Sequence, residues 1–308
     1  MKLQNIFALI VTLIGFAACT SESELLDTPV ENSDLVPVTI SLGSMQTKAS
    51  VNLDTNEGTI QNAVIGIFDN NGIPTVAPIV LTSSTNGTTR LPLVKSNAYA
   101  FVNVSDADIE ALKNISSMNE FKSYAITKQL TQVAASLPKF GEKTNFTPTA
   151  NGNIEIPVRQ LTARVETMVD IKVVQDGKDI PNPGLSFSKN SLSWTNMSFK
   201  STATQTNGND DSFTTTINGT TYTTLNRAYT YPEAKPTIEL AGSVEGDMDG
   251  FSGKQVSWSY TFPESLVKDN VYLVRFIVKV DITQPANPTF TYEVIPMTNV
   301  EIDVPSFN

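Results

Sequence analysis

Short stretches in which apolar and polar residues alternate recur along this chain, and turn-forming residues separate them. In residues 38–42, Val38, Ile40 and Leu42 alternate with polar neighbours. An alternation with a period of two places one set of side chains on each face of a β-strand. Because strands of this kind bury their apolar faces by packing sheets together, the pattern predicts a fold made of strands.

Longer apolar stretches indicate strands that are buried on both faces. Residues 63–68 and 271–282 are of this kind, and the second is the longest strand-like segment in the chain. Abundant Thr, Ser and Asn, together with 17 Pro and 16 Gly, suit strands joined by turns. We therefore predict an all-β fold with a minor helical part.

One segment has the pattern of a helix start. Asp108 follows Ser105 by three positions, as in a capping box, and Ile109 and Leu112 share one helical face. Residues 120–137 have mixed helical spacing and suggest a second, looser helix.

The length of 308 residues suffices for two domains of ordinary size. A run of strand-like sequence that hardly pauses between residues 154 and 174 marks the expected boundary. The expected parts are a signal peptide (1–18), a tether with a removable leading strand (19–48), an N-terminal β-sandwich (49–157) and a C-terminal β-sandwich (158–308).

The first residues have the features of a bacterial export signal. Lys2 precedes an apolar run at residues 6–14, and Cys19, the only cysteine, directly follows two alanines. The apolar run is shorter than the roughly 20 residues that span a bilayer, and it matches the central region of a signal peptide. The position of the cysteine is that of a lipobox, which predicts lipid attachment at Cys19. The alternative is an ordinary signal peptide with a chance cysteine.

The charge balance and the absence of histidine limit the possible functions. The formal net charge is −10 and no basic cluster offsets it, which disfavours a nucleic-acid partner. A chain without histidine has neither a Ser–His–Asp triad nor a His-ligated zinc site. No glycine-rich phosphate loop follows a strand. We expect no enzyme activity and no cofactor.

A weak metal candidate lies in an acidic turn. Glu245, Asp247 and Asp249 precede Gly250, as in the first half of a calcium loop. Val256 stands where such a loop needs a bidentate glutamate. A solvated acidic turn is therefore the favoured interpretation, and we expect no metal.

Two further features leave a carbohydrate ligand open. Trp194 and Trp258 could stack on sugar rings, although a tryptophan within a strand more often belongs to the core. A carboxylate pair for glycoside hydrolysis also stays open, because the separation of the two groups is a three-dimensional property.

Taken together, several segments resemble the fimbrillins of Bacteroidia-type (type V) pili, the FimA-like and Mfa-like proteins. The resemblance extends over nearly the whole chain and depends on the order and spacing of its parts, not on one motif. The parts are the lipoprotein leader, the strand at 38–42 before a basic residue, the strand at 63–68 with its turn at 69–72, the strand at 98–104 with the helix after Ser105, and the segments 158–165 and 270–275.

The resemblance implies two tandem transthyretin-like β-sandwich domains and a structural pilus subunit that supports adhesion. Members of the family reach the outer membrane as lipoproteins, through a lipid that would be palmitate at Cys19 here, and later form the surface fimbrium. A trypsin-like protease cuts after a basic residue, which is Lys48 here, and leaves Ala49 as the new N-terminus. The strand at 38–42 is then lost, and a strand of another pilin subunit fills its groove by donor-strand exchange.

A donor strand must present the same alternation as the strand that it replaces. Val300, Ile302 and Val304 form such a pattern near the C-terminus and are the candidate donor. The alternative is that this segment and residues 38–42 are both permanent edge strands. A different function also stays open, namely a surface lipoprotein that binds a glycan or another ligand and never polymerises.

Overall fold

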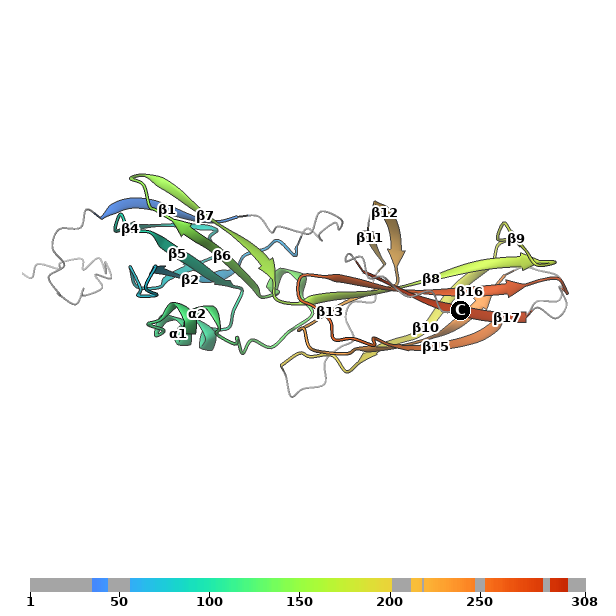
Figure 1. Cartoon of the computed structure of the whole chain (residues 1–308). Coiled ribbons are helices and arrows are strands. Elements are labelled where there is room, and N and C mark those ends of the chain that lie inside the picture. Colours follow the sequence, from blue (N-terminus) through green and yellow to red (C-terminus); the bar gives the residue numbers. More distant parts are fainter. Residues whose placement is uncertain are drawn as a thin grey trace, which may run out of the picture. The chain divides into compact units, whose positions relative to one another are not determined.

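Strands dominate the protein (Figure 1). The computed structural model describes residues 35–43, 56–200, 212–217, 219–246, 253–284 and 289–298. Strands β1 to β17 and two short α-helices lie within these ranges, so the predicted all-β fold with a minor helical part is confirmed. No helix in the described ranges is long and apolar enough to cross a membrane.

The first seven strands pair with one another, in the order β3-β2-β5-β6-β7-β1-β4. Their bounds are β1 Val36–Gly43, β2 Asn62–Asp69, β3 Ile79–Thr82, β4 Asn86–Leu91, β5 Ser96–Val102, β6 Lys139–Phe146 and β7 Gly152–Gln160. The strands predicted at 38–42 and 63–68 are thus β1 and β2.

Strand β7 connects two layers of this sheet. Its residues up to Pro157 pair in parallel with β1, whereas Val158 to Gln160 pair antiparallel with β6. An apolar core of side chains from both layers fills the space between them. Ile40 of β1 and Ile65 of β2 are both fully buried in it.

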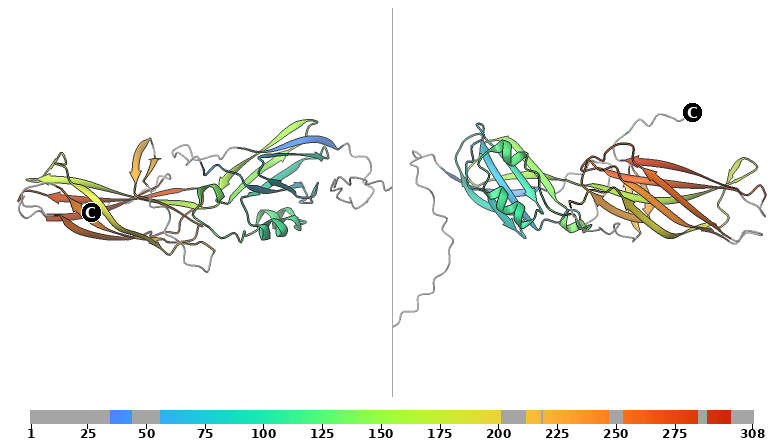
Figure 2. Two further views of the ribbon diagram at one scale, coloured as in Figure 1. Left: turned by 180° about the vertical axis from the view of Figure 1, so that it is seen from behind. Right: turned by 90° about the horizontal axis from the view of Figure 1, so that it is seen from below.

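Two helices cover the other face of β2 and β5 (Figure 2). They are α1, Asp106–Lys113, and α2, Met118–Lys122. Phe121 of α2 lies between Phe68 and Phe101, with ring centroids 5.6 Å from each. The sheet therefore has apolar contacts on both faces, as the continuous apolar sequence of β2 predicts.

The predicted capping box starts α1. The Ser105 hydroxyl accepts a hydrogen bond from the Asp108 amide, and the Asp108 carboxylate accepts one from the Ser105 amide. The second helix is shorter than predicted, because α2 ends at Lys122. Beyond it, the amides of Thr127 and Lys128 donate to the Asp108 carboxylate, at 2.6 and 3.0 Å, and so do not continue a helical ladder.

The later strands form separate sheets, in the orders β13-β8-β16-β17, with β9 beside β8, then β10-β14-β15, and β11-β12. Their bounds are β8 Ala163–Gln175, β9 Lys178–Ile180, β10 Ser186–Thr195, β11 Phe213–Ile217, β12 Thr220–Thr224, β13 Asn226–Thr230, β14 Thr237–Glu245, β15 Lys254–Thr261, β16 Val271–Asp281 and β17 Thr289–Thr298.

A second core lies between the sheet of β8 and β16 and the sheet of β10, β14 and β15. Trp194 and Trp258 belong to it and are 3% and 5% exposed. The Trp258 ring stacks on Phe276 of β16 at 5.4 Å. Both tryptophans are therefore core residues, and neither offers a sugar-stacking surface.

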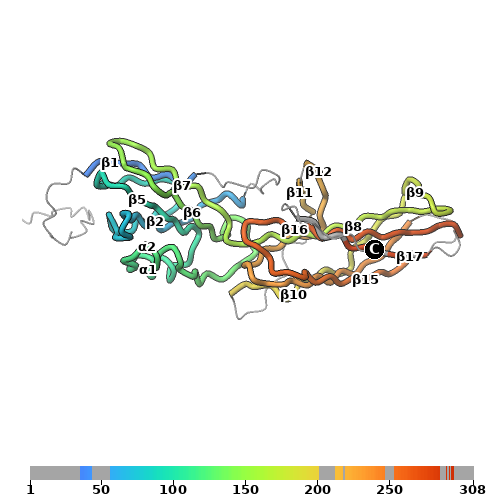
Figure 3. Tube along the Cα trace, viewed as in Figure 1, coloured from blue at the N-terminus to red at the C-terminus, as the bar shows by residue number. Residues whose placement is uncertain are grey.

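The β11-β12 hairpin is a two-stranded sheet of its own, separate from the sheet of β8 and β16 and from the sheet of β10, β14 and β15 (Figure 3). Ile217 at the end of β11 packs against Met168 of β8 and Leu273 of β16, on the face opposite the tryptophan core. Strand β8 consequently has apolar neighbours on both of its faces.

Strand pairing changes abruptly between β7 and β8. The described strands up to Gln160 pair only with one another, and so do those from Ala163 onward. The boundary predicted between residues 157 and 158 falls inside β7. Because Asp34–Asn308 forms one compact unit by its internal contacts, the division into two domains stays a prediction.

A buried lysine begins β6. Lys139 has no exposed surface, and its ammonium group donates hydrogen bonds to the carbonyls of Thr59 and Leu137, both at 3.0 Å. Burial, helped by the nearby charge of Lys128, lowers the pKa of Lys139 to about 8. The charged form is thus less favourable in the folded chain than in the unfolded one, where the pKa is about 10.5.

We predict that the contribution of Lys139 to stability grows as the pH rises from 8 toward 10, against the opposite contribution of buried tyrosines whose pKa is raised. In this window the unfolded chain holds the Lys139 proton and the folded chain releases it, so this contribution to the free energy of unfolding increases, by about 2 kcal/mol at a pH of about 9.5. Urea unfolding of the wild type at several pH values measures the increase. Lys139→Met should lack it, and an equal increase in this variant would contradict the assignment.

Candidate functional site

Strand β1 presents one apolar face to the core of the first sheet. Val38, Ile40 and Leu42 are 2%, 0% and 6% exposed and contact the apolar side chains of the opposite layer. Pro37 on the other face is exposed. The alternation predicted for this segment is present, and its three apolar side chains are buried in the core. That they fill a groove from which the strand is later removed stays a prediction.

The structure shows that residues 38–42 do not form the edge strand that one of the alternatives supposed. It lies inside the sheet, antiparallel to β4 on one side and parallel to β7 on the other (Figure 1). Ile40 stands opposite Gly87 of β4 and Ile154 of β7. Sequence alternation cannot distinguish an inner strand from an edge strand, because the pairing partners are distant in the chain.

Strand β4 depends on β1 for its place in the sheet. Among the strands that the structure describes, β1 is its ladder partner, and β4 ends the sheet order. Removal of β1 would therefore leave unpaired backbone on β7 and β4 and an apolar groove between them. The core cluster that contains Val38, Ile40 and Leu42 also contains Leu81, Leu91, Ile154 and Ile156.

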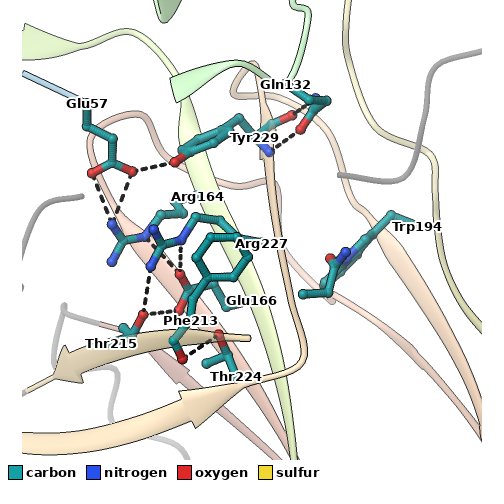
Figure 4. Close-up of polar contacts among 11 residues, drawn as sticks. Glu57, Gln132, Arg164, Glu166, Trp194, Phe213, Thr215, Thr224, Arg227 and Tyr229 are labelled. Carbon is teal, nitrogen blue, oxygen red and sulfur yellow. Dashed lines mark hydrogen bonds and ion pairs between the residues drawn. The ribbon is translucent and has the colours of Figure 1, made fainter. Parts of the chain in front are cut away.

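A buried carboxylate anchors the chain shortly after β1. Glu57 is 3% exposed, and its two oxygens accept hydrogen bonds from Arg164 Nη1 at 3.1 and 3.0 Å (Figure 4). The Tyr229 hydroxyl donates to the same carboxylate at 2.7 Å. Burial and the Glu57 charge together raise the pKa of Tyr229, so this hydroxyl keeps its proton and remains a donor.

Alternating charges continue from this anchor across two strands. Arg164 Nε lies 3.3 Å from Glu166 Oε1, and Arg227 Nε donates to the same oxygen (Figure 4). Arg164 and Glu166 of β8 stand opposite Tyr229 and Arg227 of β13 in the ladder. Burial acts to lower the pKa of Arg164, but the two carboxylates outweigh it and raise this pKa.

The hairpin β11-β12 is fixed to the same charges. The Thr215 hydroxyl donates to Glu166, and Arg227 Nη2 donates to Thr215 at 3.2 Å. The Arg227 guanidinium also lies 4.3 Å from the centre of the Phe213 ring. The row of four buried charges therefore joins the segment after β1, the strands β8 and β13, and this hairpin.

Further bonds hold the residues between Glu57 and β2. The Gln160 side chain donates to the Glu57 carbonyl at 3.2 Å, and the Asn103 side chain donates to the Thr59 carbonyl at 2.9 Å. The Gln61 amide donates back to Asn103 at 2.7 Å. None of these partners belongs to β1, so the chain from Glu57 onward is fixed independently of that strand.

Several predicted site residues lie outside the described ranges. They are Cys19, the cleavage pair Lys48 and Ala49, the acidic residues Asp247 and Asp249, and the candidate donor residues Val300, Ile302 and Val304. Their roles stay predictions. The donor segment would follow directly on β17, which pairs with β16 at the end of its sheet.

The remaining acidic residue of the weak metal candidate ends β14. The Glu245 carboxylate accepts a hydrogen bond from the Ser243 hydroxyl at 2.5 Å. Across the described ranges, no group of three or more His, Cys, Asp or Glu side chains is placed to hold a metal ion.

Sequence reasoning missed the buried charges. Arg164 and Glu166 alternate with apolar Ala163 and Val165. This alternation predicts a strand, but it does not reveal which residues pair with the two charges. A signal was present, because charged residues in a strand with continuous apolar neighbours need partners of opposite sign. Glu57 lies 107 positions from Arg164, and no local pattern marks it.

Comparison with solved structures matches the chain to adhesion and fimbrial proteins. A candidate cell adhesion protein from Bacteroides eggerthii has a TM-score of 0.51 and 14% identity, covering 87% of this chain and 97% of that one. A second such protein, from Parabacteroides distasonis, has a TM-score of 0.48 and 14% identity, covering 86% and 97%. A fimbrial assembly protein from the same species has a TM-score of 0.44 and 17% identity, covering 85% and 99%.

The first of these similarities shows that the B. eggerthii protein and this chain share a fold. The scores of the other two are too low to add to that conclusion. No protein-family model and no curated protein matches the chain.

We predict that Glu57→Ala lowers the free energy of unfolding by about 3–5 kcal/mol, because removal of one partner leaves buried charge without its counterpart. Urea unfolding at neutral pH measures the change. Glu239→Ala, at an exposed position of β14, is the matched control and should cost well under 1 kcal/mol. Equal losses in the two variants would show that Glu57 is no anchor.

Proposed function

We propose that the chain is a structural subunit of a surface fimbrium, of the Mfa-like fimbrillin type, that assembles by exchange of β1 for a strand of another subunit. The position of β1 supports this most directly, since the strand lies between β7 and β4 and plugs the core with three side chains. Its removal creates a template for β-augmentation by another chain. The fold shared with a candidate cell adhesion protein is consistent with this role.

The proposed maturation has two steps. Export as a lipoprotein, through a lipid on Cys19, brings the subunit to the outer membrane. A trypsin-like protease then cuts between Lys48 and Ala49. This cut falls between β1, which ends at Gly43, and the anchor at Glu57. The released part therefore ends before Glu57, which is held by its buried ion pair with Arg164.

The energetics favour exchange over simple loss of the strand. Burial of each of Val38, Ile40 and Leu42 contributes about 1.5–3 kcal/mol, and ladder bonds add to this. Before cleavage the covalent link between β1 and the segment from Glu57 keeps β1 at a local concentration of about a millimolar, which is lost once the chain is cut. A strand with an equivalent apolar alternation can then compete for the groove.

The proposed donor is the segment with Val300, Ile302 and Val304, which follows β17. Its alternation matches that of the three plugs in β1. In this mechanism subunits are joined by burial and backbone pairing, and no catalytic group or cofactor takes part. The partners are other pilin subunits and the processing protease.

Two variants separate the ability to accept a strand from the ability to donate one. Lys48→Gln blocks the cut and keeps the groove filled, whereas a chain that ends at Thr298 keeps the groove and lacks the candidate donor. After limited trypsin treatment we expect the wild type to lose about 48 residues and to form a ladder of oligomers on a non-boiled gel. Each variant alone should stay monomeric, and their mixture should stop at dimers.

Other outcomes would contradict specific parts of the proposal. A cleaved wild type that remains monomeric would show that β1 is permanent and that the chain does not polymerise this way. A ladder formed by the chain that ends at Thr298 would exclude the C-terminal segment as the donor. A ladder formed by uncut Lys48→Gln would exclude strand release as the trigger.

A further inference from the structure

A cavity of about 350 Å³ lies at the contact between β5 and β6 and the segments around Ser198 and Tyr231. Its volume falls at the lower end of the range of about 300–1,000 Å³ for small-molecule sites. The cavity is separate from the β1 groove, since neither Val38, Ile40 nor Leu42 lines it. The assembly mechanism gives it no role.

Aromatic rings form one side of the cavity. The Phe101 ring lies 5.0 Å from that of Phe140, and the edge of Tyr124 packs on it at 6.0 Å. The buried Tyr231 donates its hydroxyl proton to the Lys128 carbonyl at 2.8 Å, which fixes the orientation of its ring. Phe101 and Tyr231 are 3% and 4% exposed and belong to the core, whereas Tyr124 and Phe140 are partly buried. Tyr124 and Phe140 are therefore the lining rings that keep apolar surface on which the C–H face of a sugar packs.

Lysines form the other side. Lys122, Lys200 and Lys268 line the cavity, and Glu233 is the acidic residue among its lining side chains. The lining therefore carries a formal charge of +2, from three lysines and one glutamate, in a chain whose net charge is −10. A local positive site in an acidic protein attracts an anion in preference to a neutral molecule.

The three lysines differ in their contacts. Lys200 Nζ lies 4.7 Å from the centre of the Tyr231 ring and donates to the Ile126 carbonyl at 2.6 Å, so it is part of the wall. Lys122 is half exposed and lies 3.9 Å from Glu142, a long and exposed ion pair. Lys268 is exposed at the rim. Lys122 and Lys268 are therefore the lysines that can turn toward a ligand.

We propose that this cavity binds an acidic sugar unit, a pyranose ring that carries a carboxylate. The aromatic side would hold the apolar face of the ring, and Lys122 and Lys268 would pair with the carboxylate. This combination of aromatic rings and lysines discriminates against neutral sugars, which lack the charge, and against small anions, which lack the ring. The site acts independently of strand exchange.

Titration calorimetry on the purified full chain tests the proposal with four probes. They are N-acetylneuraminic acid, glucuronic acid, neutral glucose, and acetate at matched ionic strength. We expect at least one acidic sugar to bind at least about tenfold more tightly than glucose or acetate. Equal affinity for acetate would reduce the site to a nonspecific anion contact, and no binding of either acidic sugar at about 10 mM would overturn the proposal.

Matched variants locate the binding. Lys122→Gln and Lys268→Gln should each weaken the acidic sugar by up to about fivefold, the value of an exposed ion pair of about 1 kcal/mol. Tyr124→Ala should weaken the acidic sugar while leaving acetate unchanged, since only the sugar uses the aromatic side. Lys95→Gln, an exposed lysine in the turn between β4 and β5, is the control and should change nothing. Equal effects of Lys95→Gln and Lys268→Gln would overturn the assignment to the cavity.

A further pair of probes distinguishes two sources of the same chemistry. Sialyllactose presents the acid at the end of a glycan chain, whereas N-acetylneuraminic acid is the free sugar. Equal or tighter binding of sialyllactose would indicate a glycan terminus as the ligand. Binding of the free sugar alone would restrict the site to small acidic sugars.

Discussion

The hydrogen-bonded ion pair between Glu57 and Arg164 is the contact on which the arrangement of this chain depends most. Both side chains are buried, and the loss of their hydration is expensive. The cost is limited because negative and positive groups alternate from Glu57 through Arg164 and Glu166 to Arg227, so each charge has a neighbour of opposite sign. Such a row tolerates little displacement, and it fixes the segment before β2 against β8 and β13.

The chain is therefore held in two different ways on the two sides of residues 44–55. Strand β1 is held by a ladder and by apolar burial, interactions that any strand with the same alternation can reproduce. The segment from Glu57 is held by specific charges that another sequence cannot easily replace. This difference separates a replaceable part from a permanent one. It gives a physical reason why a cut between them would leave the segment from Glu57 onward anchored, while β4 would lose its ladder partner once β1 departs.

Local patterns predicted local structure well. The alternation of Val38, Ile40 and Leu42 gave the correct strand and its buried face, and Ser105 with Asp108 gave a true capping box. Features that depend on distant partners could not be predicted in this way. The interior position of β1 requires β7, more than a hundred residues later. The helix expected over residues 120–137 does not continue there, since the amides of Thr127 and Lys128 donate to Asp108 instead of to helix carbonyls.

The pairing of β1 also fixes the direction of any strand that replaces it. It runs parallel to β7 and antiparallel to β4, so a strand that reproduces these bonds can enter the groove in one direction only. In the proposed assembly, each joint places the donor strand of one subunit in the groove of the next, which is a head-to-tail step that does not close on itself as a two-fold contact does. A fibre built from such joints has polarity. Its two ends are chemically different, one presenting an open groove and the other an unused strand, and growth at the two ends would require different partners.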